Sequence, residues 1–335
     1  MSAQREKPRD HRHTARPEKL PYHERLRGRA ARNPFQIGWR GWLDITVRLV
    51  ERVSIDNLGL ITAGVTFYVF LALLPAMVAV VSFYGLITDA LTLESHVSFL
   101  RGYLPEQAIN WMGTEIGRVS HLRENGLTVA FALSIALSLW SMNNAMVALF
   151  GAMNIAYGEI EKRGIIALYV RTFAVTITSL VLGLLVVGVI VLLPLLFGGD
   201  GPAYGGRRFT APALFIVVTL GSAAIYRLGP SRKAARWRWI SVGAVTVAVG
   251  WLAASTLLSW YLSNIANYAI IYGSLGTIIA LMFWFYISIY ILLLGAQLAA
   301  EVEHQTMVDT TIGPDQPMGR RGAYVADTVG KAFGS

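Results

Sequence analysis

The chain has 335 residues, of which 54% are hydrophobic and only 15% are charged. This composition is too apolar for an ordinary soluble domain and places most of the chain in a lipid bilayer. The sequence contains no cysteine, which excludes disulfides and thiolate metal sites.

Residues 1–35 are polar and basic, and they lack the apolar core of a cleavable signal peptide. We expect a disordered cytoplasmic tail here. Residues 36–56 then read as an amphipathic helix, with Trp39 and Trp42 among its apolar residues. Its opposite face carries Arg40, Asp44, Arg48, Glu51 and Arg52. This pattern predicts an interfacial helix, anchored by the two tryptophans, whose arginines face anionic lipid. Regulation by lipid is the alternative role.

Six apolar windows follow, each long enough to cross the hydrocarbon core, which takes about 20 residues of helix. They lie near residues 60–88, 127–150, 165–197, 209–228, 239–262 and 275–299. None shows the period-2 alternation of a membrane β-strand. We therefore predict an all-α polytopic membrane protein with a six-helix domain over 57–303 and a disordered cytoplasmic tail over 304–335.

The orientation follows from the positions of lysine and arginine. These residues crowd the region before the first window and the loops after the second and fourth windows. Because cytoplasmic loops of membrane proteins are enriched in lysine and arginine, both termini are predicted to be cytoplasmic, in an inner or plasma membrane. Arg207 and Arg208 are the exception, since they follow the third window.

Polar side chains inside the windows are candidates for a cavity or a transport path. In a bilayer such groups either join helices or line a wet interior. The candidates within the spans are Asn143, Asn144, Arg171, Tyr286, Tyr290 and Gln297. Arg171 can instead snorkel to the membrane surface. Pro75 predicts a kink in the first span, which can be purely architectural.

The connector 263–276 between the last two windows is polar but has no charged residue. Its Asn264, Asn267, Tyr268 and Tyr272 can satisfy an irregular backbone at membrane depth. We interpret it as a cap or lining of an internal cavity. The alternative is an ordinary hairpin with interfacial tyrosines.

Several motifs occur in a recognisable order. They are 63–68 (AGVTFY), 71–75 (LALLP), 139–141 (LWS), 154–158 (NIAYG), 237–239 (WRW), 261–264 (YLSN), 272–276 (YGSLG) and 293–298 (LLGAQL). Together they resemble the YihY/virulence factor BrkB family of bacterial inner-membrane proteins, once labelled ribonuclease BN. The resemblance implies six spans and a bacterial inner membrane. It implies no established activity, because the ribonuclease label is regarded as a misassignment. Many members have a glutamate where this chain has Gln297.

Intramembrane polarity favours a transporter or flippase-like protein for a lipid, an amphiphile or a small solute. The alternative is a non-transporting scaffold that supports envelope integrity through its charged tails. An enzyme, including a ribonuclease, is not expected, because the histidines fall in tails or loops. We predict no catalytic residue, cofactor or metal, and no specific nucleic-acid partner. The expected partners are membrane lipids, anionic at the cytoplasmic face, and the oligomeric state is left open.

Overall fold

A computed structural model describes residues 20–87, 113–114, 127–196, 205–264 and 275–334. Its long helices are α2 (Trp39–Ile55), α3 (Leu58–Ile87), α6 (Leu127–Ala156), α7 (Ile165–Leu196), α8 (Gly205–Leu228), α9 (Trp237–Asn264) and α11 (Leu275–His304). The short ones are α1 (Tyr22–Leu26), η2 (Pro34–Gln36) and α12 (Tyr324–Asp327). The β-structure within these residues is an isolated bridge between Ala235 and Thr311. The predicted all-α polytopic fold is confirmed.

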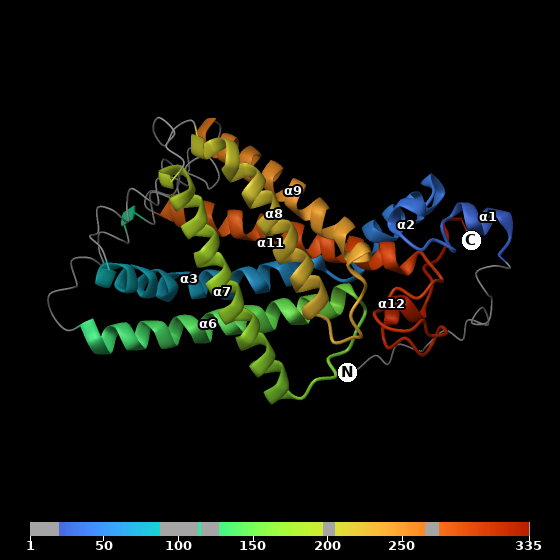
Figure 1. The fold of residues 1–335 in the computed structure, drawn as a ribbon, viewed down its shortest axis with the longest axis horizontal. Coiled ribbons are helices and arrows are strands. Elements are labelled where there is room, and N and C mark those ends of the chain that lie inside the picture. Colours follow the sequence, from blue (N-terminus) through green and yellow to red (C-terminus); the bar gives the residue numbers. More distant parts are fainter. Residues whose placement is uncertain (1–19, 88–112, 115–126, 197–204, 265–274, 335) are drawn as a thin grey trace.

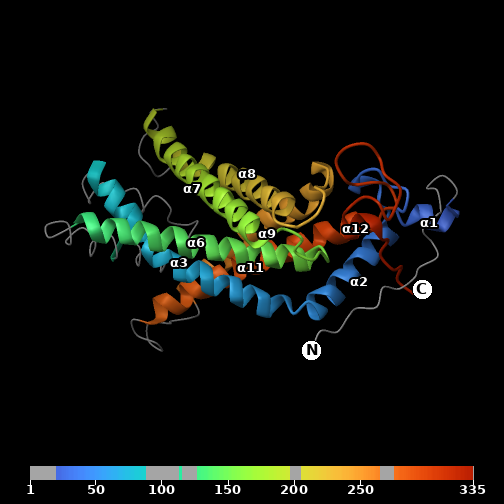
Figure 2. The ribbon, with the colours of Figure 1, turned by 90° about the horizontal axis from the view of Figure 1, so that it is seen from below.

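Five of the described helices, α6 to α9 and α11, are each long and apolar enough to cross a membrane. Over its fully described part, α3 passes the same test as one bent pair with α2, which makes up to six spans. The two helices meet at an angle of 62°, and Figure 2 shows the bend. Asn57 lies at the break with a φ of 50°, a left-handed conformation that asparagine tolerates.

The short helices and the polar segments gather at one end of the bundle (Figures 1 and 2). We call this the polar end. It comprises residues 20–37, α2, the loops 157–164 and 229–236, the C-terminal end of α11 and residues 305–334. The long helices run away from it and supply the apolar body of the protein.

The segment after α11 differs from the prediction of a disordered tail over 304–335. Residues 305–334 fold against the polar end, and Gln305, Thr310 and Thr311 are buried there. Composition misled the prediction, because this segment is ordered by hydrogen bonds to other elements rather than by an apolar core of its own. Residues 20–35 were also expected to be disordered, yet Arg29 and Ala31 are buried against the same end. Residues 1–19 lie outside the described residues.

Helix α2 occupies the segment predicted to be an interfacial helix, but its charged row is turned inward. Arg48 and Arg52 both contact Glu301 of α11, so the expectation that these arginines face lipid is wrong. The apolar row points outward instead, with Trp39 72% exposed. Trp42 is partly buried against a cluster that includes Trp239. Placement of this helix at a membrane surface stays a prediction.

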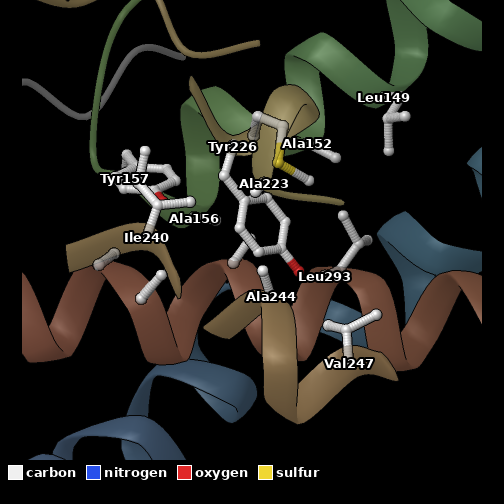
Figure 3. Close-up of a cluster of buried hydrophobic side chains, with 14 of the residues drawn as sticks. Leu149, Ala152, Ala156, Tyr157, Ala223, Tyr226, Ile240, Ala244, Val247 and Leu293 are labelled. Atoms are coloured by element: carbon white, nitrogen blue, oxygen red, sulfur yellow. The ribbon is translucent and has the colours of Figure 1, made fainter. Parts of the chain in front are cut away.

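The largest apolar cluster joins α3, α6, α8, α9 and α11, and Figure 3 shows part of it. At its centre α9 and α11 cross at two glycines. A Cβ atom added at Gly243 would overlap the carbonyl oxygen of Gly295, and one added at Gly295 would overlap Val247. Close approach of backbones through small residues is the usual basis of helix association in membranes, where lipid is as apolar as the helix surface.

We therefore expect Gly243→Ala to lower the free energy of unfolding by roughly 1–3 kcal/mol, the usual range for overpacking. The clash involves backbone, which cannot rotate away. The matched control is Gly221→Ala on α8, where an added Cβ meets nothing within 4 Å. Alanine there should be neutral or stabilising by up to about 1 kcal/mol, because glycine disfavours helix. SDS-induced unfolding in mixed micelles, followed by circular dichroism, measures both; equal effects would contradict this account of the crossing.

Candidate functional site: the polar ladder and the buried amides

Two rows of polar residues face each other between α2 and α11. The first row is Asp44, Arg48 and Arg52 on α2 and Asp56 directly after it. The second row is Gln297 and Glu301 on α11 and Gln305 directly after it. Residues four apart lie on one face of a helix, so the members of each row are neighbours on the same side of their segment. We call the two facing rows the polar ladder.

Glu301 lies at the centre of the ladder and binds two arginines of α2. Its Oε2 accepts a 2.6 Å hydrogen bond from Nε of Arg48, and its Oε1 lies 3.4 Å from Nε of Arg52. Both arginines are largely withdrawn from solvent, with side-chain exposures of 10% and 19%. The central rung is thus a carboxylate held between two guanidinium groups.

The two ends of the ladder are closed by amides and aspartates. At the bundle side, Nε2 of Gln297 donates to Oδ2 of Asp56 at 3.3 Å. At the outer side, Oε1 of Gln305 accepts from Arg48 at 2.8 Å, and its Nε2 lies 3.3 Å from Oδ2 of Asp44. Each glutamine therefore bridges an α11 position to an α2 position.

Charge in the ladder is balanced. The carboxylates of Asp44, Asp56 and Glu301 are matched by Arg48 and Arg52 within it and by Arg27, whose NH1 lies 2.6 Å from Oδ1 of Asp44. Removing one member of a buried pair leaves an uncompensated charge, which costs far more than the pair contributes. The ladder therefore fixes the position of α2 along α11.

A second buried ion pair lies beside the ladder. Arg232, in the loop between α8 and α9, binds Glu303 at 2.5 Å, and both side chains are almost fully buried. Burial opposes the charge on Arg232, but the neighbouring carboxylate outweighs it and raises the pKa of Arg232. The guanidinium also lies 5.1 Å from the ring centroid of Tyr157, so this pair joins the end of α6 to the end of α11.

The 154–158 motif forms a junction of loops at the polar end. Oδ1 of Asn154 accepts from the backbone N–H of Ser231 at 2.7 Å, and its Nδ2 donates to Glu161 at 2.8 Å. Hydrogen bonds from Arg163 lower the pKa of Glu161 to about 2. Gly158 has a φ of 65° and ends α6 in the left-handed conformation that favours glycine. This motif therefore ties α6, the 157–164 loop and the 229–236 loop together.

Two of the predicted path residues are buried amides with an unmet acceptor. Gln297 is 1% exposed and Asn143 is buried, and neither Oε1 of Gln297 nor Oδ1 of Asn143 has a hydrogen-bond partner among the described residues. They lie on α11 and α6, which contact each other. Tyr286 and Tyr290 stack on α11 with ring centroids 6.2 Å apart.

The other predicted residues are not buried, or they lie outside the described residues. Asn144 is only partly buried, and Arg171 is exposed on α7. Asn264 is exposed at the end of α9, where its Nδ2 donates to the carbonyl of Trp260 at 2.8 Å. Asn267, Tyr268 and Tyr272 lie outside the described residues, so the role of the connector stays a prediction. Pro75 lies within α3, and its kink likewise stays a prediction.

Sequence reasoning missed the ladder although its signal was present. The four-residue spacing of 44, 48, 52 and 56 and of 297, 301 and 305 was visible in the sequence. The first row was interpreted as a face turned toward anionic lipid. The second row was divided between the end of a span, with Gln297, and a disordered tail, with Gln305. A row of alternating charge on one helix finds a buried partner only when the facing helix carries a matching row, and one sequence does not say which helices face each other.

The comparison with protein families agrees with this architecture. The model of the virulence factor BrkB family matches residues 49–319, which include Arg52, Asp56, Gln297 and Glu301. The chain belongs to this family.

Relatives of this BrkB-family chain include YfkH of Bacillus subtilis (strain 168), which is named as ribonuclease-like. It is 29% identical over 252 residues, 71% of this chain and 88% of YfkH. A UPF0761 membrane protein of Albidiferax ferrireducens is 26% identical over 268 residues, 77% of this chain but only 62% of that relative. UPF0761 membrane protein NTHI0384 of Haemophilus influenzae is 22% identical over 259 residues, 76% and 93% of the two chains. No solved structure matches.

We expect Arg48→Met and Glu301→Gln each to lower the free energy of unfolding of this BrkB-family protein by about 3–5 kcal/mol, since each removes one member of a buried ion pair and unbalances the charge of the ladder. The double variant should lose clearly less than the sum, because the two residues interact directly. Arg40→Met, on the exposed face of α2, is the control and should change it by less than about 0.5 kcal/mol. If the loss in the double variant equalled the sum of the two single losses, measured by SDS unfolding, the two side chains would not interact.

A matched pair of tyrosines tests the core in Figure 3, where the hydroxyl of Tyr226 points at α11. This hydroxyl donates to the carbonyl of Leu292 at 2.6 Å, whereas that of Tyr157 has no partner among the described residues. Tyr226→Phe should therefore lower the free energy of unfolding by about 1 kcal/mol. Tyr157→Phe should be neutral or stabilising, since it removes an unpaired buried hydroxyl. A comparable loss in both, measured by the same unfolding assay, would contradict the assignment.

Proposed function

We propose that this BrkB-family membrane protein is a transporter or flippase-like protein that moves a lipid, an amphiphile or a small solute. The observation that carries the proposal is the pair of unmet acceptors on Asn143 and Gln297, buried between helices. A buried polar atom without a hydrogen bond costs roughly 1–3 kcal/mol. Polar groups inside membrane helices tend to mark the pathways of substrates or ions.

The seam where α3, α6 and α11 contact one another is the proposed route. On α3, Thr62 and Thr66 are buried, and each donates its hydroxyl to a carbonyl one turn earlier in its own helix at 2.7 Å. These hydroxyls have therefore used their donors and keep acceptor capacity. With the amide oxygens of Asn143 and Gln297, the seam offers acceptors, which suits a cargo that carries hydrogen-bond donors.

The chemistry of these groups also bears on the class of cargo. Asn143, Thr62 and Thr66 are uncharged, so the seam supplies no counter-ion for a small ion at their level. A lipid or another amphiphile with hydroxyl or ammonium groups is the better match, because its donors meet the acceptors while its apolar part stays in contact with apolar helix surface.

We further propose that the polar end faces the cytoplasm of a bacterial inner membrane. Basic loop residues such as Lys162, Arg163 and Arg232 lie at this end, as the positive-inside rule requires. The outward apolar row of α2, including Trp39 and Val50, would rest on the membrane surface. Exposed Arg40, 5.5 Å from the Trp39 ring centroid, would meet anionic headgroups.

Transport is tested by reconstituting the purified protein into liposomes that carry fluorescent phospholipids, with a dithionite assay for movement between leaflets. We expect protein-dependent movement, and we expect Asn143→Leu to reduce its rate by about tenfold, the effect of roughly 1.4 kcal/mol. Thr246→Val is the control, because Thr246 is exposed on α9 and its hydroxyl only donates to Val242 within the helix.

Failure to move any of a panel of phospholipids, amphiphiles and small solutes would contradict the proposal and favour the non-transporting scaffold. We propose no catalytic role for this protein. RNA cleavage that persists through repeated purification would overturn that part.

A further inference from the structure

Residues 306–334 cross the polar end as a single strap, which we call the clasp (red in Figure 1). Near its start Thr311 pairs with Ala235 in the isolated β-bridge. Its middle includes the short helix α12, and its last described residues lie against α2. The clasp thus touches the 229–236 loop, the 157–164 loop that follows α6, and α2.

The last part of the clasp is held by its backbone rather than by its side chains. NH2 of Arg29 donates to the carbonyl of Gly330 at 2.6 Å, and NH1 of Arg48 donates to that of Lys331 at 2.9 Å. The backbone N–H of Phe333 donates to Oδ1 of Asp44 at 2.8 Å. The clasp therefore supplies peptide groups, and the bundle supplies the charges that bind them.

A second attachment lies at α12. The backbone N–H of Tyr324 donates to Glu159 at 2.6 Å, and Val325 is buried in the main apolar cluster. The hydroxyl of Thr328 lies 2.9 Å from Nε2 of His304, at the end of α11. Few other apolar side chains of the clasp are buried, so the clasp is bound to the polar end mainly by polar contacts.

Arg48 and Asp44 are ladder residues that also bind the clasp. Arg48 binds Glu301 and Gln305 in the ladder and the Lys331 carbonyl in the clasp. Asp44 bonds Gln305 in the ladder and the N–H of Phe333 in the clasp. When the clasp leaves, these two side chains lose partners and water reaches the outer rungs, where it can replace the remaining hydrogen bonds.

The fit of the clasp against Arg48 leaves no room for a side chain. A Cβ atom at Gly330 would lie 2.5 Å from Cζ and 2.6 Å from Nε of Arg48. Arg48 is itself fixed by Glu301 and Gln305, so it cannot move aside without breaking the ladder. A larger side chain at Gly330 should therefore push the end of the clasp away from Arg48.

We propose that the clasp is a releasable strap that holds α2 against α11, and that its release opens the polar end of the bundle. The use of that opening, to admit or discharge cargo, rests on the proposed function. Release itself is a property of the chain alone. It is measurable without any cargo.

The absence of native cysteine allows a direct test with one introduced thiol. Val302→Cys places it in the buried cluster between α2, α9 and α11. In this background, Gly330→Leu should raise the rate of maleimide labelling by about tenfold, as expected when a hydrogen bond to a charged group is lost. Hydrogen exchange of residues 321–334 should rise as well. Lys331→Ala should change neither, because Lys331 takes part through its carbonyl and its side chain is exposed.

A chain that ends at Ala323 is the second variant, since it lacks α12 and the end of the clasp. Val302→Cys should label faster in it, while Leu258→Cys, a buried reporter in the separate cluster with Leu262 and Ala280, should stay protected. Unchanged labelling of Val302→Cys in both variants would overturn the proposal. Faster labelling of Leu258→Cys would overturn it too, because the opening would then not be confined to the polar end.

A disulfide separates this inference from the transport proposal. Cysteines at 235 and 311 replace a β-bridge pair, whose Cα atoms lie about 4.5–5.5 Å apart, within disulfide reach. Oxidation should slow Val302→Cys labelling of the Gly330→Leu variant and also slow lipid movement, with recovery on reduction. If oxidation did not slow the labelling of Val302→Cys, the clasp proposal would be contradicted. If oxidation slowed the labelling but the protein moved no lipid, only the transport proposal would be contradicted.

Discussion

The pairing of Glu301 with Arg48 and Arg52 is the interaction on which the polar end depends. A helix such as α2, with a row of charges on one side and a row of apolar residues on the other, has two surfaces to satisfy. The row on α11 binds the charges, and this leaves the apolar row facing outward. The 62° bend at Asp56 and Asn57 then follows, because α2 must turn away from the direction of α3 to lie along the end of α11.

Two kinds of contact hold the molecule together, and they respond differently to their surroundings. Inside the bundle, Gly243 and Gly295 let backbones meet, and the Tyr226 hydroxyl ties α8 to α11. Lipid offers no hydrogen-bonding groups that could compete for these contacts. At the polar end, the ladder and the clasp consist of charged pairs and peptide hydrogen bonds, for which water competes. The bundle is therefore suited to be the fixed part, and the polar end to be the part that changes.

The sequence was sufficient for the spans, because a long apolar run in a bilayer has essentially one solution, the helix. It was insufficient where polar residues choose between water and a buried partner. Arg48 was expected to face lipid and Gln305 to lie in a disordered tail, and each became buried because the other provides its hydrogen bond. This mutual dependence cannot be predicted from the sequence of either segment by itself. Gln297 and Asn143, which were predicted to be polar groups within the spans, are buried in α11 and α6, and their role in a path stays a prediction.

Gln297 connects the two parts of the molecule. Its amide nitrogen belongs to the last rung of the ladder, at Asp56, while its amide oxygen is buried without a partner. A change that moves α2 away from α11 shifts Asp56 and frees the amide to turn, which alters the acceptor offered to the seam. The ladder and the proposed route thus share one side chain. A glutamine suits this position because it offers a donor and an acceptor at once, whereas an ionised glutamate would place two acceptors beside the carboxylate of Asp56 and repel it.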